Sequence, residues 1–223
     1  MRRCGMKIYP IAATVFLVIL GTIARAADEP TAPGLAREVW KASGGESWSG
    51  VKELRFTFVV EVEGKTVASA AHIWKVAEGT DEVTWKDKHV TINVNTPPTE
   101  GDAKAAYARW VNDSYWLIAP LKVLDPGVTV KAEGAKEING VASETLQLSF
   151  GAVGLTPTDR YVMYVDPQTK LLRSWDYQPK EGAGMQATWE KYETFGGLKL
   201  STEHHFGGKT IKFTDVKVTM AGG

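Results

Sequence analysis

The residues Leu54-Arg55-Phe56-Thr57-Phe58-Val59-Val60-Glu61-Val62-Glu63 carry apolar side chains at every even position and mostly polar side chains at the odd positions. Alternation with a period of two is typical of a β-strand that buries one face. Gly64-Lys65 then reads as a hairpin turn, and Thr66 to Val76 continues as a second strand. This passage predicts a fold built from antiparallel β-strands.

Strands with similar patterns follow along the rest of the chain. They are predicted at Val83 to Trp85, His89 to Val94, Val128 to Ala132, Ser143 to Phe150, Arg160 to Val165, Leu171 to Tyr177, Met185 to Phe195, Leu198 to Phe206 and Thr210 to Met220. Their linkers are short and rich in Gly, Pro and Asn, which favours antiparallel neighbours in a meander. About ten or eleven strands in one sheet twist and curl, so we expect an α+β, mainly antiparallel fold: an incomplete β-barrel with a concave face.

Two segments break the strand pattern and are predicted to be helical. Pro33 opens a segment with Leu35, Val39 and Trp40 at helical spacing, and Gly44-Gly45 closes it. Asp102 to Leu121 is rich in Ala and aromatic residues and predicts one or two short helices that end near Pro120. Both segments have an apolar face, so we expect them to cover the hollow of the curled sheet as a lid.

The N-terminus has the pattern of a secretory signal peptide. Arg2, Arg3 and Lys7 precede an apolar run from Ile11 to Leu20, and Ala24-Arg25-Ala26 supplies small residues for a cut after Ala26. The run is too short to favour a stable membrane span, although an uncleaved N-terminal anchor is the alternative. We therefore predict a signal peptide at 1–26, a single domain at 27–223 and a periplasmic location, with secretion as the alternative.

Charge and cysteine content exclude several classes of function. Loss of residues 1–26 lowers the Lys and Arg total from 26 to 22 against 26 Asp and Glu, which leaves a net charge of about −4. Without a basic cluster, nucleic acid is not an expected partner. The single cysteine, Cys4, lies before the apolar run, so disulfides, cysteine nucleophiles and thiolate metal sites are not expected in the mature domain.

Motifs for catalysis or metal binding are missing from the sequence. There is no Gly-x-Ser-x-Gly elbow, and 45–50 (Gly-Glu-Ser-Trp-Ser-Gly) is interpreted as a helix stop and a turn. His204 and His205 are adjacent on a strand and face opposite sides, so we expect one partly buried histidine and one surface histidine. The carboxylates Asp81, Glu82, Asp113, Asp125, Asp159, Asp166 and Asp176 are interpreted as turn or strand-end residues. We predict no catalytic residue, no metal ligand and no cofactor.

Aromatic residues are the unusual feature of the composition, with eight tryptophans that all follow the signal peptide. Such a set either lines an apolar pocket or fills an ordinary core. The hollow of a curled sheet favours a lining role for several of them. The candidate lining residues for a hydrophobic ligand are Trp74, Trp85, Trp110, Tyr115, Trp116, Tyr164, Trp175 and Trp189.

The order of elements resembles that of the LolA/LolB-like periplasmic lipoprotein carriers. Locally, the resemblance rests on Ala36 to Phe58 and on 110–120 (Trp-Val-Asn-Asp-Ser-Tyr-Trp-Leu-Ile-Ala-Pro). The second block is also similar to that of a less characterised group of exported β-rich proteins of unknown function, which have a Tyr-Trp-Leu segment followed by Asp-Pro-Gly, here Asp125-Pro126-Gly127. Where carriers place an Arg-Pro pair after the second strand, this chain has Lys75-Val76-Ala77.

The resemblance implies an incomplete barrel, closed by helices, that shields acyl chains without performing chemistry. We therefore expect a non-enzymatic carrier for a lipid, an acylated protein or another hydrophobic ligand, with transient contact to a membrane or a lipoprotein. The alternative is an envelope protein-interaction or assembly module whose interior is filled by its own side chains. A carrier predicts a sizeable apolar cavity, whereas an assembly module predicts an exposed apolar patch.

Overall fold

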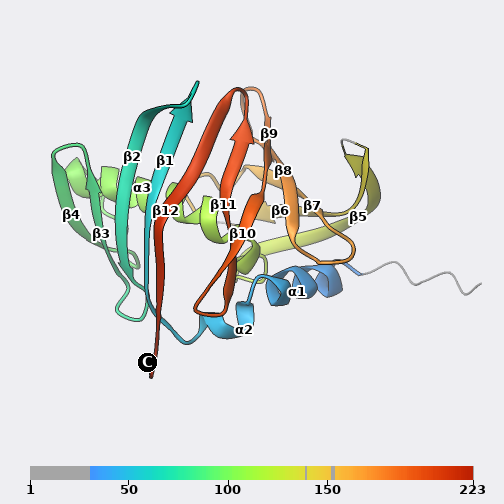
Figure 1. Ribbon diagram of the computed structural model, residues 1–223, viewed down its shortest axis with the longest axis horizontal. Helices are drawn as coiled ribbons and strands as arrows, with labels where there is room; N and C mark the ends of the chain where they lie inside the picture. Colours follow the sequence, from blue (N-terminus) through green and yellow to red (C-terminus); the bar gives the residue numbers. More distant parts are fainter. Residues whose placement is uncertain (1–30, 139, 152–153, 223) are drawn as a thin grey trace, which may run out of the picture.

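The computed structural model describes residues 31–138, 140–151 and 154–222, so the predicted signal peptide lies outside the described residues. The elements and their connections are shown in Figure 1. The helices are α1 (Ala32–Ala42), α2 (Gly45–Trp48), α3 (Gly101–Ile118) and a 3₁₀ turn (Ala119–Leu121). The strands are β1 (Val51–Val62), β2 (Lys65–Lys75), β3 (Thr80–Trp85), β4 (Lys88–Asn93), β5 (Val128–Ile138), β6 (Val141–Phe150), β7 (Arg160–Val165), β8 (Leu172–Gln178), β9 (Met185–Thr188), β10 (Glu190–Phe195), β11 (Leu198–Phe206) and β12 (Lys209–Met220).

The twelve strands form two antiparallel sheets. The first sheet has the order β10-β11-β12-β1-β2-β3-β4, and the second is the meander β5-β6-β7-β8-β9. The predicted mainly antiparallel, open architecture is confirmed, but one continuous sheet is not: the strands are divided between two sheets, neither closed into a barrel. Pairing of β1 with β12 joins the two ends of the strand sequence at the centre of the first sheet (Figure 1).

The chain passes from the second sheet to the first at Trp189. Met185 to Phe195 was predicted as one strand, but β9 pairs with β8 and β10 pairs with β11. The indole of Trp189 is only 3% exposed and packs in the core against Trp175 and His204. The buried Trp189 side chain therefore lies where strand β9 ends and β10 begins, so that one stretch of the chain contributes a strand to each sheet.

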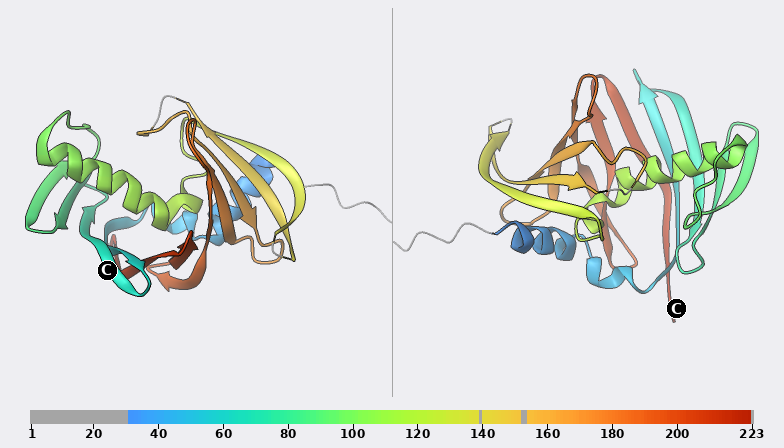
Figure 2. Two further views of the ribbon diagram at one scale, coloured as in Figure 1. Left: turned by 90° about the horizontal axis from the view of Figure 1, so that it is seen from above. Right: turned by 180° about the vertical axis from the view of Figure 1, so that it is seen from behind.

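Helix α3 lies across the inner side of the first sheet and reaches the second sheet with its C-terminal end (Figure 2). It contacts β3, β4 and β11 along its length. The predicted helical insertion is thus one long helix, followed by the 3₁₀ turn that contains Pro120. Its N-terminal half covers a small apolar cluster with Trp85 and Ala106. Its C-terminal half joins the main core, which draws residues from both sheets.

The N-terminal helices lie against the lower edge of the molecule in Figure 1. Helix α1 begins after Thr31, whose hydroxyl accepts a hydrogen bond from the Gly34 amide, and Leu35 and Val39 bury its apolar side. The segment interpreted as a turn after α1 instead contains the one-turn helix α2. The Ser43 carbonyl accepts a hydrogen bond from the Lys199 amide, which fastens α1 to the first sheet.

Candidate ligand-binding pocket

A cavity of about 290 Å³, here called the aromatic pocket, lies between the C-terminal half of α3 and the second sheet. It is bounded by Val111, Asn112, Tyr115, Trp116, Phe150, Gly154, Leu155, Thr156, Tyr161, Trp175, Tyr177 and Met185. None of these residues carries a charged side chain. The volume is at the lower end of the roughly 300–1,000 Å³ that is usual for small-molecule sites.

The geometry of helix and strand explains why these residues converge. On α3, Val111 and Tyr115 are four residues apart, as are Asn112 and Trp116, so each pair lies on one face. On β8, Trp175 and Tyr177 are two residues apart and share a face of the strand. Tyr161 of β7 lies directly opposite Tyr177 in the ladder and therefore projects to the same side.

Trp175 forms the floor of the aromatic pocket and is 1% exposed. Its ring stacks on Tyr115, with centroids 5.7 Å apart and 21° between the planes. Trp116 and Tyr161 each lie 4.8 Å from it, centroid to centroid. Offset and tilted contacts of this kind favour a rigid aromatic wall, because each ring is held by several neighbours.

The phenol groups of the aromatic pocket stay neutral at physiological pH. Burial raises the pKa of Tyr115 well above its usual value, and burial also raises the pKa of Tyr161. Burial, together with the hydrogen bond that Tyr177 donates to Asp159 at 2.6 Å, raises the pKa of Tyr177 to about 12. The Tyr115 hydroxyl and the Trp175 Nε1 are buried and have no hydrogen-bond partner within the described part of the chain. The walls are therefore mainly aromatic rings, and the Tyr115 hydroxyl and the Trp175 Nε1 are two buried groups that a ligand could hydrogen-bond.

A second cavity of about 200 Å³, the tryptophan pocket, lies on the other side of the α3 C-terminal half and is more polar. Trp48, Trp74 and Trp110 contribute rings, and Lys122 and Asp125 contribute charges. The Trp74 ring centroid is 5.7 Å from that of Trp48 and 5.4 Å from that of Trp110. Because the Lys122 ammonium donates to Asp125 at 2.5 Å, the two charges of this pocket already satisfy each other.

The structure brings five of the eight predicted aromatic residues to these two cavities. Tyr115, Trp116 and Trp175 line the aromatic pocket, and Trp74 and Trp110 line the tryptophan pocket.

The other three predicted residues lie elsewhere. Trp85 packs in the small cluster under α3 with the Arg109 guanidinium 4.6 Å above its ring. Tyr164 points its hydroxyl to Asp176, and Trp189 is enclosed in the core.

Six apolar or aromatic lining residues were not predicted from the sequence: Val111, Phe150, Leu155, Tyr161, Tyr177 and Met185. Tyr177 lies two residues after Trp175 on β8, and Tyr161 of β7 is its ladder partner. Strand alternation therefore identifies both residues once the pairing of β7 with β8 is known. Leu155 and Thr156 belong to the connection between β6 and β7, where no periodicity points to a role.

A buried polar network lies under α3, beside the pockets. His72 Nδ1 is 2.7 Å from Asp81 Oδ2, and His72 Nε2 is 3.1 Å from Asp113 Oδ2. All three residues are at most 4% exposed. Asp81 lies at the start of β3, in keeping with its interpretation as a turn or strand-end residue. The same interpretation is wrong for Asp113, which lies within α3. The network ties α3 to the first sheet.

Burial by itself lowers the pKa of His72, but the hydrogen bonds that its ring donates to Asp113 and Asp81, and the attraction of both carboxylates, outweigh it. The result is a pKa raised to about 8, so His72 is cationic at neutral pH. His204 behaves oppositely, because burial among Trp116, Trp189 and Phe213 lowers its pKa to about 3. His204 is completely buried in the core, more than the partial burial that was predicted, and its neighbour His205 is partly exposed on the other face.

No protein-family model matches the sequence, and no curated protein shows significant similarity to it. Among solved structures, a DUF1329 family protein from Desulfovibrio piger superposes with a TM-score of 0.50 at 12% identity, over 85% of this chain and 93% of that chain. At this identity the likeness concerns the fold alone. It confirms the predicted resemblance in fold and carries no statement about function.

Two further solved structures match with lower TM-scores. A putative outer membrane lipoprotein-sorting protein domain from Vibrio parahaemolyticus gives 0.49 at 11% identity, over 83% of this chain and 91% of that chain. A LolA superfamily protein from Nitrosomonas europaea gives 0.46 at 8% identity, over 82% and 93%. Within the described residues of the present chain, no helix has the length and hydropathy needed to cross a membrane.

Proposed function

We propose that the protein is a non-enzymatic binding protein that carries an apolar ligand, such as one acyl chain, in the aromatic pocket. The observation that supports this most directly is a preformed cavity walled by Tyr115, Trp116, Tyr161 and Trp175 without a charged side chain. Each methylene group moved from water into such a site contributes about 0.8 kcal/mol. A volume of about 290 Å³ suits a single chain or a small ring system rather than a bulky lipid with several chains.

The distribution of titratable groups supports binding rather than catalysis. A catalytic site would bring an acid, a base or a nucleophile to the cavity wall. His72, Asp81 and Asp113 do form a network, but they are buried beneath α3 and face one another, outside the lining of both cavities. The aromatic pocket offers a ligand packing surface and neutral hydroxyl groups.

We infer that the chain works outside the cytoplasm, in the periplasm, as a single domain over residues 27–223 after cleavage of the signal peptide at 1–26. Leu155 supports transient contact with a membrane or a lipoprotein, because it lines the aromatic pocket and is 53% exposed. An apolar side chain at the opening would meet the surface from which a ligand enters.

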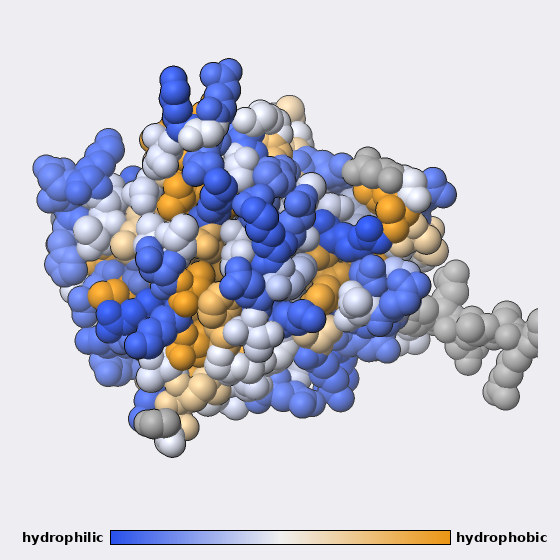
Figure 3. Space-filling model, viewed as in Figure 1, coloured by the Kyte–Doolittle hydropathy of each residue, from blue (hydrophilic) through white to orange (hydrophobic). Residues whose placement is uncertain are grey.

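The surface gives less support to the alternative of an assembly module. Hydrophilic residues cover most of the face in Figure 3, with narrow hydrophobic areas between them. The described residues include only four exposed large apolar side chains: Val67, Leu124, Val141 and Leu155. A protein-binding face would present a larger set of such residues in one patch.

The test is a fluorescence titration with a dansyl-labelled fatty acid. Val111 is half-buried in the pocket wall on α3, so Val111→Trp fills the cavity from a helix that tolerates a large residue. Loss of the cavity is expected to weaken probe binding at least about tenfold, which corresponds to about 1.4 kcal/mol.

Val67→Trp is the matched control, because it makes the same change at a site that is 60% exposed on β2 and outside both cavities. It is expected to bind the probe as the unmodified protein does. Equal affinity of the Val111→Trp variant, with far-UV circular dichroism and the thermal unfolding midpoint unchanged, would refute the proposal.

A further inference from the structure

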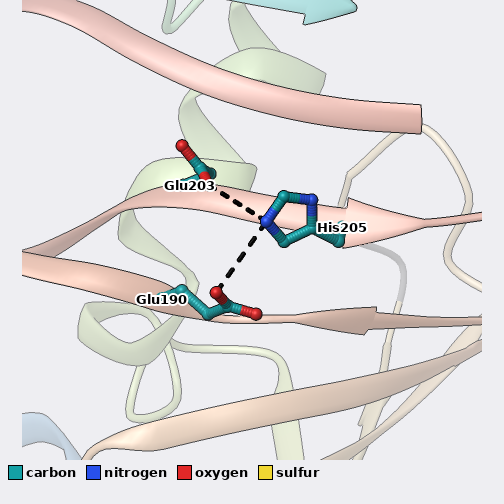
Figure 4. Close-up of side chains that lie close together, drawn as sticks. All are labelled: Glu190, Glu203 and His205. Carbon is teal, nitrogen blue, oxygen red and sulfur yellow. Dashed lines mark hydrogen bonds and ion pairs between the residues drawn. The ribbon is translucent and has the colours of Figure 1, made fainter. Parts of the chain in front are cut away.

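Three potential metal ligands meet on β10 and β11, away from the aromatic pocket (Figure 4). Glu190 and Glu203 lie directly opposite each other in the β10–β11 ladder, and His205 is two residues beyond Glu203 on the same face of β11. One oxygen or nitrogen atom from each residue lies within 4.8 Å of the others. The histidine Nε2 lies 3.0 Å from Glu203 Oε1 and 3.8 Å from Glu190 Oε2.

The imidazole of His205 is held in the orientation that metal binding requires. Its Nδ1 lies 3.1 Å from the Thr210 hydroxyl on β12, and its backbone amide donates to the Thr188 hydroxyl at 3.0 Å. Without an ion, Nε2 donates to Glu203 Oε1; when an ion displaces that proton, Nδ1 carries the remaining one and donates to Thr210, and Nε2 turns its lone pair toward the ion between the two carboxylates. Outer partners of this kind fix the tautomer of ligating histidines in known metal sites.

Charge at this position also favours a bound cation. Two like charges directly opposite each other in a ladder are destabilising, and Glu190 faces Glu203. Lys191 donates to Glu203 Oε2 at 2.6 Å, which balances one negative charge and leaves Oε1 turned toward His205. The set of two carboxylates and Lys191 therefore keeps one excess negative charge for a divalent ion.

We propose that Glu190, Glu203 and His205 bind a divalent transition-metal ion, best represented by Zn²⁺. An imidazole nitrogen with two carboxylate oxygens suits Zn²⁺, whereas Ca²⁺ and Mg²⁺ prefer sites made of oxygen alone. Three protein ligands leave one tetrahedral position for water or a partner's side chain. The site would join the edge strand β10 to β11 one residue after Trp189, where the chain changes sheets.

Isothermal titration of the purified protein with ZnCl₂, combined with metal analysis after dialysis, tests the site. We expect one Zn²⁺ per chain and at least about tenfold weaker binding of Ca²⁺. His205→Ala is expected to weaken Zn²⁺ binding at least about 100-fold, and Thr210→Val about tenfold, in keeping with the 10- to 100-fold effect of outer partners. The His205 side chain is 43% exposed, so its removal leaves the core intact.

His89→Ala is the matched control, because His89 is another exposed histidine with a glutamate nearby, Glu82, at 3.8 Å. It is expected to leave Zn²⁺ binding unchanged. Absence of stoichiometric Zn²⁺ binding, equal binding by the His205→Ala variant, or equal affinity for Ca²⁺ would each overturn the proposal.

Discussion

Both ring nitrogens of the buried His72 face carboxylates, one from β3 and one from α3. Buried charge is costly unless it is paired and hydrogen-bonded, and here the cation lies between two anions. Phe56 stacks on the imidazole with a centroid distance of 4.6 Å, which adds an apolar wall to the network. His72 is therefore the residue through which pH acts on the attachment of α3.

The folded protein is expected to lose about 2 kcal/mol of stability between about pH 6 and about pH 9 through His72. Its pKa is raised from 6.5 to about 8 on folding, so the folded state binds the proton more tightly than the unfolded state. This contribution is fully present below pH 6.5 and is lost as the pH rises through about 8. Urea unfolding across this range measures it.

His72→Gln replaces the imidazole by an amide that can still donate a hydrogen bond but does not titrate. This variant is expected to lack the loss of stability between about pH 6 and about pH 9. The difference in slope between the two proteins isolates His72 from other groups that titrate in the same range. If both proteins show the same pH dependence, His72 does not carry the charge assigned to it.

The direction of a single side chain was predictable where strand alternation alone determines it, and contacts between residues far apart in the sequence were not. The opposite faces of His204 and His205 follow from alternation alone. The meeting of Asp113 with His72 depends on where α3 crosses the sheet, and no local pattern encodes that crossing. The same holds for Glu190 and Glu203, which face each other only because β10 pairs with β11 in that register.

At the scale of elements, glycine determines how α1 is joined to the first sheet. Gly44 has a φ of 83°, and a Cβ at this position would lie 2.1 Å from the Gly197 carbonyl oxygen in the turn between β10 and β11. A left-handed backbone and a close backbone contact together exclude any side chain. The sequence identified Gly44 as a helix stop, whereas its contact with Gly197 required the structure.

Gly44→Ala is therefore expected to destabilise the protein by more than about 3 kcal/mol, through strain and displacement of the β10–β11 turn. Gly64→Ala is the matched control, because Gly64 has a φ of 73° but no atom within 4 Å of the added Cβ. Its cost is expected to be about 1 kcal/mol. Equal losses in urea unfolding would show that the contact with Gly197 is unimportant.

Strand boundaries were predictable to within a few residues, and the exceptions have local causes. The alternation of β12 shifts by one residue at Asp215, whose φ is 55°. Before the shift the odd-numbered Ile211 and Phe213 face the core, and after it the even-numbered Val216 and Val218 do. This bulge lies opposite Phe56, and the neighbouring Thr57 hydroxyl donates to the Asp215 carboxylate at 3.0 Å. A similar irregularity in β5 lies between Ala132 and Ala135 and extends that strand beyond its predicted end.

For the whole molecule, the division into two sheets creates the cavity. The short linkers predicted antiparallel neighbours correctly, but they did not reveal that the second sheet ends at Thr188 and that Glu190 begins the edge strand of the first sheet. Because α3 reaches from the first sheet to the second, its C-terminal half forms one wall of the aromatic pocket, and β7 and β8 form the other. The position of α3 over the sheets and the convergence of Tyr115, Trp116 and Trp175 follow from this single arrangement.

The central claim is that the aromatic pocket holds an apolar ligand. Native mass spectrometry of the protein purified from its own cell envelope tests it most directly, with Val111→Trp and Val67→Trp purified in parallel. We predict a defined lipid or acyl adduct on the unmodified protein and on Val67→Trp, and its loss from Val111→Trp. A clean mass without adduct on the unmodified protein, or an adduct that persists on Val111→Trp, would contradict the claim.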